Sequence, residues 1–254
     1  MVRARCAHGV GRALLPVHWF TGSGRAGVPV LDWFRPRAAL REERIVNRVA
    51  LTIDGKQLEV PPGTTVLDAA RGAGIHIPTL CHHQKLKPAG ACRLCHVEVS
   101  TAARQQILLP ACATAVEEGM MVKTDAPRVL EARRFILALT LARAPQPPKL
   151  VELARQHGVE LKPDASDPLL TFLYRRVEAR QAEVGQEGLS WCILCGQCVR
   201  VCAEVVGMRA IGSASRGPKK RIATPFFDIS PACIGCGSCA HVCPTDAITI
   251  SEAE

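Results

Sequence analysis

The sequence is poor in aromatic residues, which make up only 4% of its 254 residues, and it contains no run of 18 apolar residues. A core must therefore be built mainly from Val, Leu, Ile and Ala, and a membrane-spanning helix is excluded. The apolar stretch at residues 13–17 is too short for a secretory signal. No facing pair of catalytic side chains and no phosphate-binding loop is present, so the sequence indicates a function other than catalysis by side chains.

One residue type is abundant, because the chain has thirteen cysteines. Twelve fall into three groups of four, and only Cys6 is left over. A disulfide framework has no reason to divide in this way, and cysteine clusters in a chain without a secretory signal more often bind metal. The cysteines therefore predict three four-thiolate metal sites.

The net charge of +9 is unevenly distributed. Residues 1–44 form an Arg-rich extension in which eight arginines face three acidic residues, so this segment carries +5 and the rest of the chain only +4. An oxidised iron–sulfur site with four thiolates has a charge of about −2, and three such sites would make the body of the chain slightly negative. We therefore expect no nucleic-acid partner. For residues 1–44 an organelle transit peptide and a misplaced start codon both stay open.

Residues 45–124 are predicted to form a small α/β domain. A strand over residues 46–53, a turn at Asp54 and Gly55, and a return strand over 57–60 make a hairpin. Thr64 or Thr65 can cap a helix over 66–73, and further short strands are expected at 97–99, 107–109 and 121–123. This order is typical of a β-grasp ferredoxin.

Residues 125–190 contain no cysteine and are predicted to be a helical spacer. A helix should run from Pro127 to about residue 142, with Ala132, Ile136 and Leu139 on one face. Two more helices are expected over residues 150–157 and 169–183. His157 stands alone in this segment and is expected to cap a helix or face solvent.

The first cysteine group comprises Cys81, Cys92, Cys95 and Cys112. Its central C-x2-C with a remote fourth cysteine is similar to the plant-type pattern of a two-iron cluster, although the first gap is longer. A structural zinc site is the alternative, but zinc usually takes two C-x2-C pairs. The group therefore predicts a [2Fe–2S] cluster.

The last eight cysteines form an internal repeat in residues 191–254, which suggests a two-cluster bacterial ferredoxin-like domain. The run ending in Cys243 and Pro244 matches C-x2-C-x2-C-x3-C-P, and the first run differs only in having Ala203 in place of the proline. In two-cluster ferredoxins the fourth cysteine of each run binds the other cluster. One [4Fe–4S] site should therefore use Cys192, Cys195, Cys198 and Cys243, and the other Cys202, Cys233, Cys236 and Cys239. Two zinc sites are the alternative.

These motifs, with the flanking sequences Thr79-Leu80-Cys81, Cys92-Arg93-Leu94-Cys95 and Cys198-Val199-Arg200-Val201-Cys202, resemble a known family. The similarity is to the N-terminal part of the large iron–sulfur subunit of respiratory complex I and to the small diaphorase subunit of bidirectional NAD-linked nickel–iron hydrogenases. The family usually carries a further [4Fe–4S] site with one His and three Cys. Here that region, residues 143–149, has neither residue type.

The resemblance implies an α+β protein with a β-grasp [2Fe–2S] domain, a short helical linker and a two-cluster domain. It implies a non-catalytic, cytoplasmic electron-transfer subunit with one [2Fe–2S] and two [4Fe–4S] clusters. The implied partners are an NAD(P)H-binding flavin subunit, a thioredoxin-like [2Fe–2S] subunit and a terminal catalytic subunit of the hydrogenase, formate dehydrogenase or heterodisulfide-reductase type. A free-standing polyferredoxin and an iron–sulfur redox sensor are the alternatives.

Overall fold

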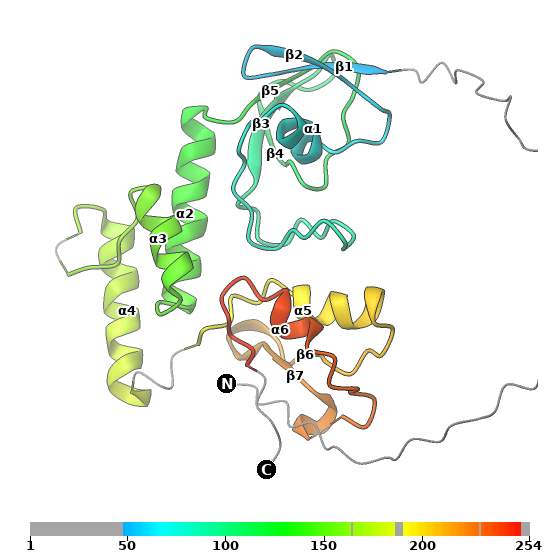
Figure 1. The fold of residues 1–254 in the computed structure, drawn as a ribbon. Helices are drawn as coiled ribbons and strands as arrows, with labels where there is room; N and C mark the ends of the chain where they lie inside the picture. The colour runs from blue at the N-terminus through cyan, green and yellow to red at the C-terminus, as the bar shows by residue number, and fades with distance from the viewer. Residues whose placement is uncertain (1–47, 164, 186–189, 229, 250–254) are drawn as a thin grey trace, which may run out of the picture.

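The computed structural model describes residues 48–163, 165–185, 190–228 and 230–249. The N-terminal extension and Cys6 lie outside these residues. Figure 1 shows a sheet with one helix at the N-terminal side, a group of three helices beside it, and a smaller unit of short helices and strands at the C-terminal side. The α+β fold class and the order of the two ferredoxin-like units agree with the prediction.

The N-terminal unit is a five-stranded mixed sheet in the order β2-β1-β5-β3-β4. Its strands are β1 (Val49–Ile53), β2 (Lys56–Val60), β3 (His96–Ser100), β4 (Ile107–Pro110) and β5 (Met120–Lys123). The expected hairpin is present, with Ile53 paired to Lys56 across Asp54 and Gly55, both of which have positive φ. Two residues in the left-handed region match the twist of the flanking strands, which explains the tight connection.

Helix α1 (Val66–Gly72) packs against this sheet. The side chain of Thr65, one of the two predicted caps, accepts a hydrogen bond from the Asp68 backbone N–H at 3.1 Å. This bond satisfies one of the free N–H groups at the helix start. Fully buried Val66, Leu67 and Ile53 form part of the core between helix and sheet, which is aliphatic as the composition required.

Three helices follow, namely α2 (Pro127–Arg143), α3 (Pro148–Gln156) and α4 (Pro168–Val184). Each begins at a proline, because the first helical position needs no backbone donor and suits the fixed φ of proline. Their core contains Leu137, Leu150 and Leu173. It also takes in Leu80 and Leu94, which lie beside the first cysteine group, so the helices and the cysteine loop are packed together.

The buried face of α2 is not the face that carries Ala132, Ile136 and Leu139. The buried residues are Val129, Arg133, Leu137, Ala138 and Leu141. Leu139 is 44% exposed, and Ala132 and Ile136 are only partly buried. Arg133 lies on the buried face, where one guanidinium nitrogen donates to the His96 carbonyl of β3 at 3.1 Å.

The C-terminal unit contains short elements. They are α5 (Gln197–Arg200), the π-helical turn η1 (Val201–Val205), β6 (Gly212–Ala214), the 3-10 turn η2 (Gly217–Lys219), β7 (Arg221–Ala223), the 3-10 turn η3 (Pro225–Phe227) and α6 (Ser238–His241). Strands β6 and β7 form an antiparallel pair. The short helices α5 and α6 each begin directly after a glycine with positive φ, Gly196 and Gly237, at matching places in the two cysteine runs. This correspondence agrees with the repeat seen in the sequence.

Candidate iron–sulfur sites

The first cysteine group lies where the β3–β4 hairpin meets two loops. His96 pairs with Pro110 at the open end of the hairpin, and the Ala111 N–H donates to the Cys95 carbonyl at 3.0 Å. Cys95 and Cys112, which flank this end, are therefore held next to each other, and both are buried. Cys81 is also buried.

The four thiols form two pairs. The thiols of Cys81 and Cys92 lie next to each other, as do those of Cys95 and Cys112. The neighbouring Cys92 thiol lowers the pKa of Cys81 to about 5, and the Cys81 thiol together with burial raises the pKa of Cys92. Two adjacent pairs of sulfurs suit two irons with two thiolates each, which is the ligand set of a [2Fe–2S] cluster.

Backbone N–H groups also point at these sulfurs. The Cys92 N–H donates to the Cys81 sulfur at 3.3 Å. Within the same loop Arg93 has a positive φ of 65°, which turns the chain between Cys92 and Cys95. Hydrogen bonds to ligand sulfurs are one way in which proteins tune the potential of iron–sulfur sites.

The second predicted site, that of Cys192, Cys195, Cys198 and Cys243, lies around α5. Cys195 and Cys198 are largely shielded, and burial raises the pKa of their thiols to about 11 and about 12. The Cys192 and Cys243 thiols are close enough to add to both shifts. The structure thus brings Cys243, from the second run, to the three leading cysteines of the first run.

The third predicted site, that of Cys202, Cys233, Cys236 and Cys239, is more exposed to solvent than the second. Cys233 and Cys236 are exposed, and both lie within electrostatic reach of Cys239. Cys202 lies in η1, which packs against α6, the helix that carries Cys239. The Ala210 N–H donates to the Cys202 sulfur at 3.2 Å. The two sites of the C-terminal unit therefore differ in solvent access.

No three His, Cys, Asp or Glu side chains in the described ranges converge tightly enough to hold a single metal ion. Each thiolate of an iron–sulfur cluster binds one of its two or four irons, so the four thiolates need not converge on one point. The donors in all three groups are soft thiols, with backbone N–H groups directed at several of the sulfurs. This donor chemistry fits iron–sulfur clusters.

The ligand loops of the two ferredoxin-like units are in direct contact. An Arg200 guanidinium nitrogen donates to the Cys81 carbonyl at 2.7 Å, and the Gln197 side-chain amide donates to the Leu80 carbonyl at 2.7 Å. In Figure 1 the loop that follows β-grasp helix α1 extends toward α5. The Cys81 thiol is also close enough to Cys195 to raise the pKa of that thiol. Sequence spacing gave no sign of this contact.

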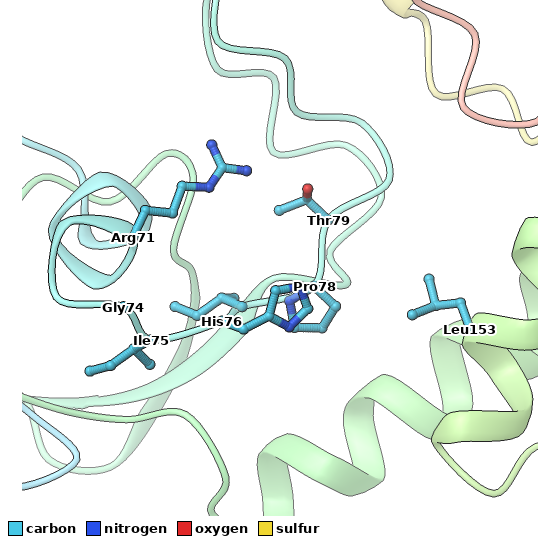
Figure 2. Close-up of a pocket in the computed structure, with 8 residues that line it drawn as sticks. Arg71, Gly74, Ile75, His76, Pro78, Thr79 and Leu153 are labelled. Carbon is cyan, nitrogen blue, oxygen red and sulfur yellow. The ribbon is translucent and has the colours of Figure 1, made fainter.

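A separate hollow of about 360 Å³ lies between the N-terminal unit and α3. Figure 2 shows Arg71, His76 and Thr79 on one side of it and Leu153 of α3 on the other. None of the twelve cysteines lines it. It belongs to the seam between the sheet domain and the helices, and the redox chemistry is placed elsewhere.

Comparison with known protein families matches this geometry. A family of 2Fe-2S iron–sulfur cluster binding domains matches residues 46–127, and a family of 4Fe-4S dicluster domains matches residues 191–247. The chain is an iron–sulfur protein built from these two domains. The first match spans the Cys81 group and the second spans the two later cysteine runs.

Several curated proteins are similar to this iron–sulfur protein. One subunit of the NADH-quinone oxidoreductase of Rhizobium meliloti is 36% identical over 79% of the chain. NADP-reducing hydrogenase subunit HndD of Solidesulfovibrio fructosivorans is 33% identical over 82% of it, and NADPH-Fe(3+) oxidoreductase subunit alpha of Geobacter sulfurreducens is 36% identical over 79%. The chain spans 24%, 37% and 24% of the length of these three relatives.

A solved structure has the same fold. A chain of an NAD+-reducing [NiFe]-hydrogenase in the H2-reduced state superposes with a TM-score of 0.59 at 25% identity, covering 78% of the iron–sulfur protein and 86% of that chain. The expected resemblance to complex I and NAD-linked hydrogenase subunits is thus confirmed. Within the described residues, no helix combines the length and hydropathy that crossing a bilayer requires.

Proposed function

We propose that this protein is a cytoplasmic electron-relay subunit of an NAD(P)-linked, multi-subunit oxidoreductase. It holds one [2Fe–2S] cluster on Cys81, Cys92, Cys95 and Cys112. It holds two [4Fe–4S] clusters, one on Cys192, Cys195, Cys198 and Cys243 and the other on Cys202, Cys233, Cys236 and Cys239. When bound, such clusters supply one-electron transfer.

The observation that carries the proposal is the contact between the ligand loops. Arg200, between ligands Cys198 and Cys202, is hydrogen-bonded to the backbone of ligand Cys81. A relay needs redox sites that are close together and shielded, and a carrier with independent domains has no need of this contact. The segment between the domains supplies no fourth set of sulfur donors, since residues 125–190 contain no cysteine.

The Cys81 group and the segment of Cys233 and Cys236 differ in their exposure to solvent, and we propose that electrons enter the relay at one of them and leave at the other. The thiols of the Cys81 group are largely buried, whereas Cys233 and Cys236 are exposed. The nearby segment also exposes Phe226, Phe227 and Ile234, with exposed fractions of 96%, 59% and 63%. Partner docking would cover these apolar side chains, which are unusual on a free surface.

The charge of this region points to the kind of partner. Residues 205–227 contain five basic residues and no Asp or Glu. The Arg221 guanidinium stacks on the Phe227 ring at 4.1 Å from its centroid. We therefore propose that the partner here is a redox subunit that presents acidic side chains around its own electron-accepting or electron-donating group.

The relatives suggest which partner subunits exchange electrons with the protein away from this basic region. The names of three of them specify NADH, NADP and NADPH, whereas their second reactants differ. We therefore propose an NAD(P)H-binding flavin subunit and a thioredoxin-like [2Fe–2S] subunit as partners, with a terminal catalytic subunit of the hydrogenase, formate dehydrogenase or heterodisulfide-reductase type.

Two measurements test the proposal. The anaerobically purified chain should contain about ten iron atoms and give both two-iron and four-iron electron paramagnetic resonance (EPR) signals after reduction. Stoichiometric zinc without visible absorbance would disprove the cluster assignment. The tagged protein, purified from its native host, should bring a flavoprotein with it. A protein that elutes alone with all its clusters would instead be a diffusing polyferredoxin.

A further inference from the structure

Three side chains on one face of the α5–η1 segment hold the loop that carries Cys81. Gln197, Arg200 and Glu204 are three and four residues apart, the spacing that places side chains on one side of a helix. They make four hydrogen bonds, all to the backbone of residues 80–87. We call this set the latch.

The Arg200 and Glu204 side chains both form hydrogen bonds with the backbone of Lys87. One guanidinium nitrogen of Arg200 donates to the Lys87 carbonyl at 2.7 Å, and the other donates to the Cys81 carbonyl at 2.7 Å. A Glu204 carboxylate oxygen accepts from the Lys87 N–H at 3.0 Å. Arginine suits this role because its planar fork can hold two carbonyls at a fixed separation, which a lysine ammonium cannot do with the same rigidity.

The latch is partly buried, and burying polar and charged side chains costs folding free energy. The Gln197 residue is only 4% exposed. The Arg200 Nε is buried and has no hydrogen-bond partner among the described residues. Leu86, Val201 and Val242 form a small apolar core beside it, linking the loop, η1 and the segment after α6. An unpaired donor on a charged group weakens the fold, so simple adhesion between domains would be served better by apolar residues.

We propose that Arg200 is a positioning residue that, together with Gln197 and Glu204, fixes the separation of the [2Fe–2S] site and the Cys192–Cys195–Cys198–Cys243 site, and that its charge raises the reduction potential of the [2Fe–2S] site. This inference rests on the proposed relay function. Reduction adds a negative charge to a cluster, and a cation held nearby in a poorly solvated place stabilises that charge. The Arg200 guanidinium is held beside this site by its hydrogen bond to the Cys81 carbonyl.

The test uses the full-length protein, purified anaerobically with its clusters. Redox titration of the two-iron EPR signal gives the potential, and magnetic coupling between the reduced two-iron and four-iron sites gives their separation. Arg200→Gln removes the charge and one arm of the fork. We expect it to lower the ratio of reduced to oxidised [2Fe–2S] at a fixed potential by about three- to tenfold, and to weaken the coupling.

Two further variants separate charge from geometry. Arg200→Lys keeps the charge but loses the fork, so the potential should stay near the wild-type value while the coupling weakens. Glu204→Gln should weaken the coupling without lowering the potential. Arg175 is an exposed arginine on α4, and Arg175→Gln is the matched control that should change neither quantity.

The latch is disproved if Arg200→Gln keeps its clusters and shows the wild-type potential and coupling. If that variant loses its two-iron signal, the lysine and Glu204 variants decide, and unchanged coupling in both would disprove the latch. These outcomes are distinct from failure of the relay function, which would appear in the wild-type protein as absent clusters or as no electron exchange between them.

Discussion

The Arg143 guanidinium at the end of α2 donates from Nε to the Cys192 carbonyl at 3.2 Å and from Nη2 to the Lys220 carbonyl at 3.0 Å. One side chain of the helical segment thus holds both the first cysteine of the C-terminal runs and the basic segment before β7. The region where the family usually has its His/Cys site begins at this same residue. Here it contributes hydrogen bonds to the cluster domain in place of metal ligands.

Arg143→Ala should loosen the C-terminal unit without removing a ligand. Hydrogen bonds from a charged donor contribute about 1.5–3 kcal/mol, and their loss leaves two carbonyls to be satisfied by water. We expect faster proteolysis between residues 185 and 225 and earlier thermal loss of four-iron absorbance. Arg134→Ala, at an exposed position on the same helix, is the control. Equal proteolysis of the two variants would contradict the role of Arg143.

Exchange of fourth ligands between the two runs can be tested by paired substitutions. Cys243→Ser should damage the site of Cys192, Cys195 and Cys198, because the Cys243 thiol lies close to that group. Cys202→Ser should damage the site of Cys233, Cys236 and Cys239. Mössbauer and EPR spectra of each variant will show which four-iron signal is altered. The crossed assignment is wrong if Cys202→Ser disturbs only the site of the run to which it belongs.

The buried face of α2 predicts a difference between Leu137 and Leu139, two leucines of the same helix. Leu137→Ala removes a fully buried side chain from the helical core and should lower the free energy of unfolding by about 2–5 kcal/mol. Leu139→Ala should change it by less than about 0.5 kcal/mol, since Leu139 is 44% exposed. Denaturant unfolding followed by circular dichroism measures both. A larger loss at Leu139 than at Leu137 would contradict this buried face.

The proposed docking region predicts salt-sensitive partner binding. Reversing two charges with Lys219→Glu and Lys220→Glu should slow electron transfer to the partner by about tenfold at low salt, with a smaller effect at high salt, because exposed charges act mainly on encounter. Phe226→Ser should weaken binding at both salt concentrations, since it removes apolar contact area.

The matched control for these charge reversals is the pair Lys56→Glu and Lys123→Glu, at two exposed lysines of the sheet domain. Stopped-flow kinetics with the co-purified partner complex measures all variants. If the control slows transfer as much as the Lys219 and Lys220 pair, the effect is one of net charge, and the proposed docking region is wrong.

Much of the fold was fixed by local chemistry and could be predicted. The Asp54–Gly55 turn, the Thr65 cap and Pro127 at the start of α2 each act on their own few residues, so their signals are readable in the sequence. The cysteine spacing likewise predicted the order of the two domains, which the two family matches confirm, whereas the ligand sets it gives stay predictions.

Only the tertiary structure decided the burial of Arg133 and the pairing of Gln197 with the Leu80 carbonyl. Local periodicity placed Ala132, Ile136 and Leu139 on one face, but a helix that contacts both β3 and its neighbouring helices buries whichever face fits them, and Arg133 finds its acceptor on β3. Gln197 and Leu80 are 117 residues apart in sequence. No local pattern encodes such a contact, since it forms only when separately folded units dock and the buried carbonyl needs a donor.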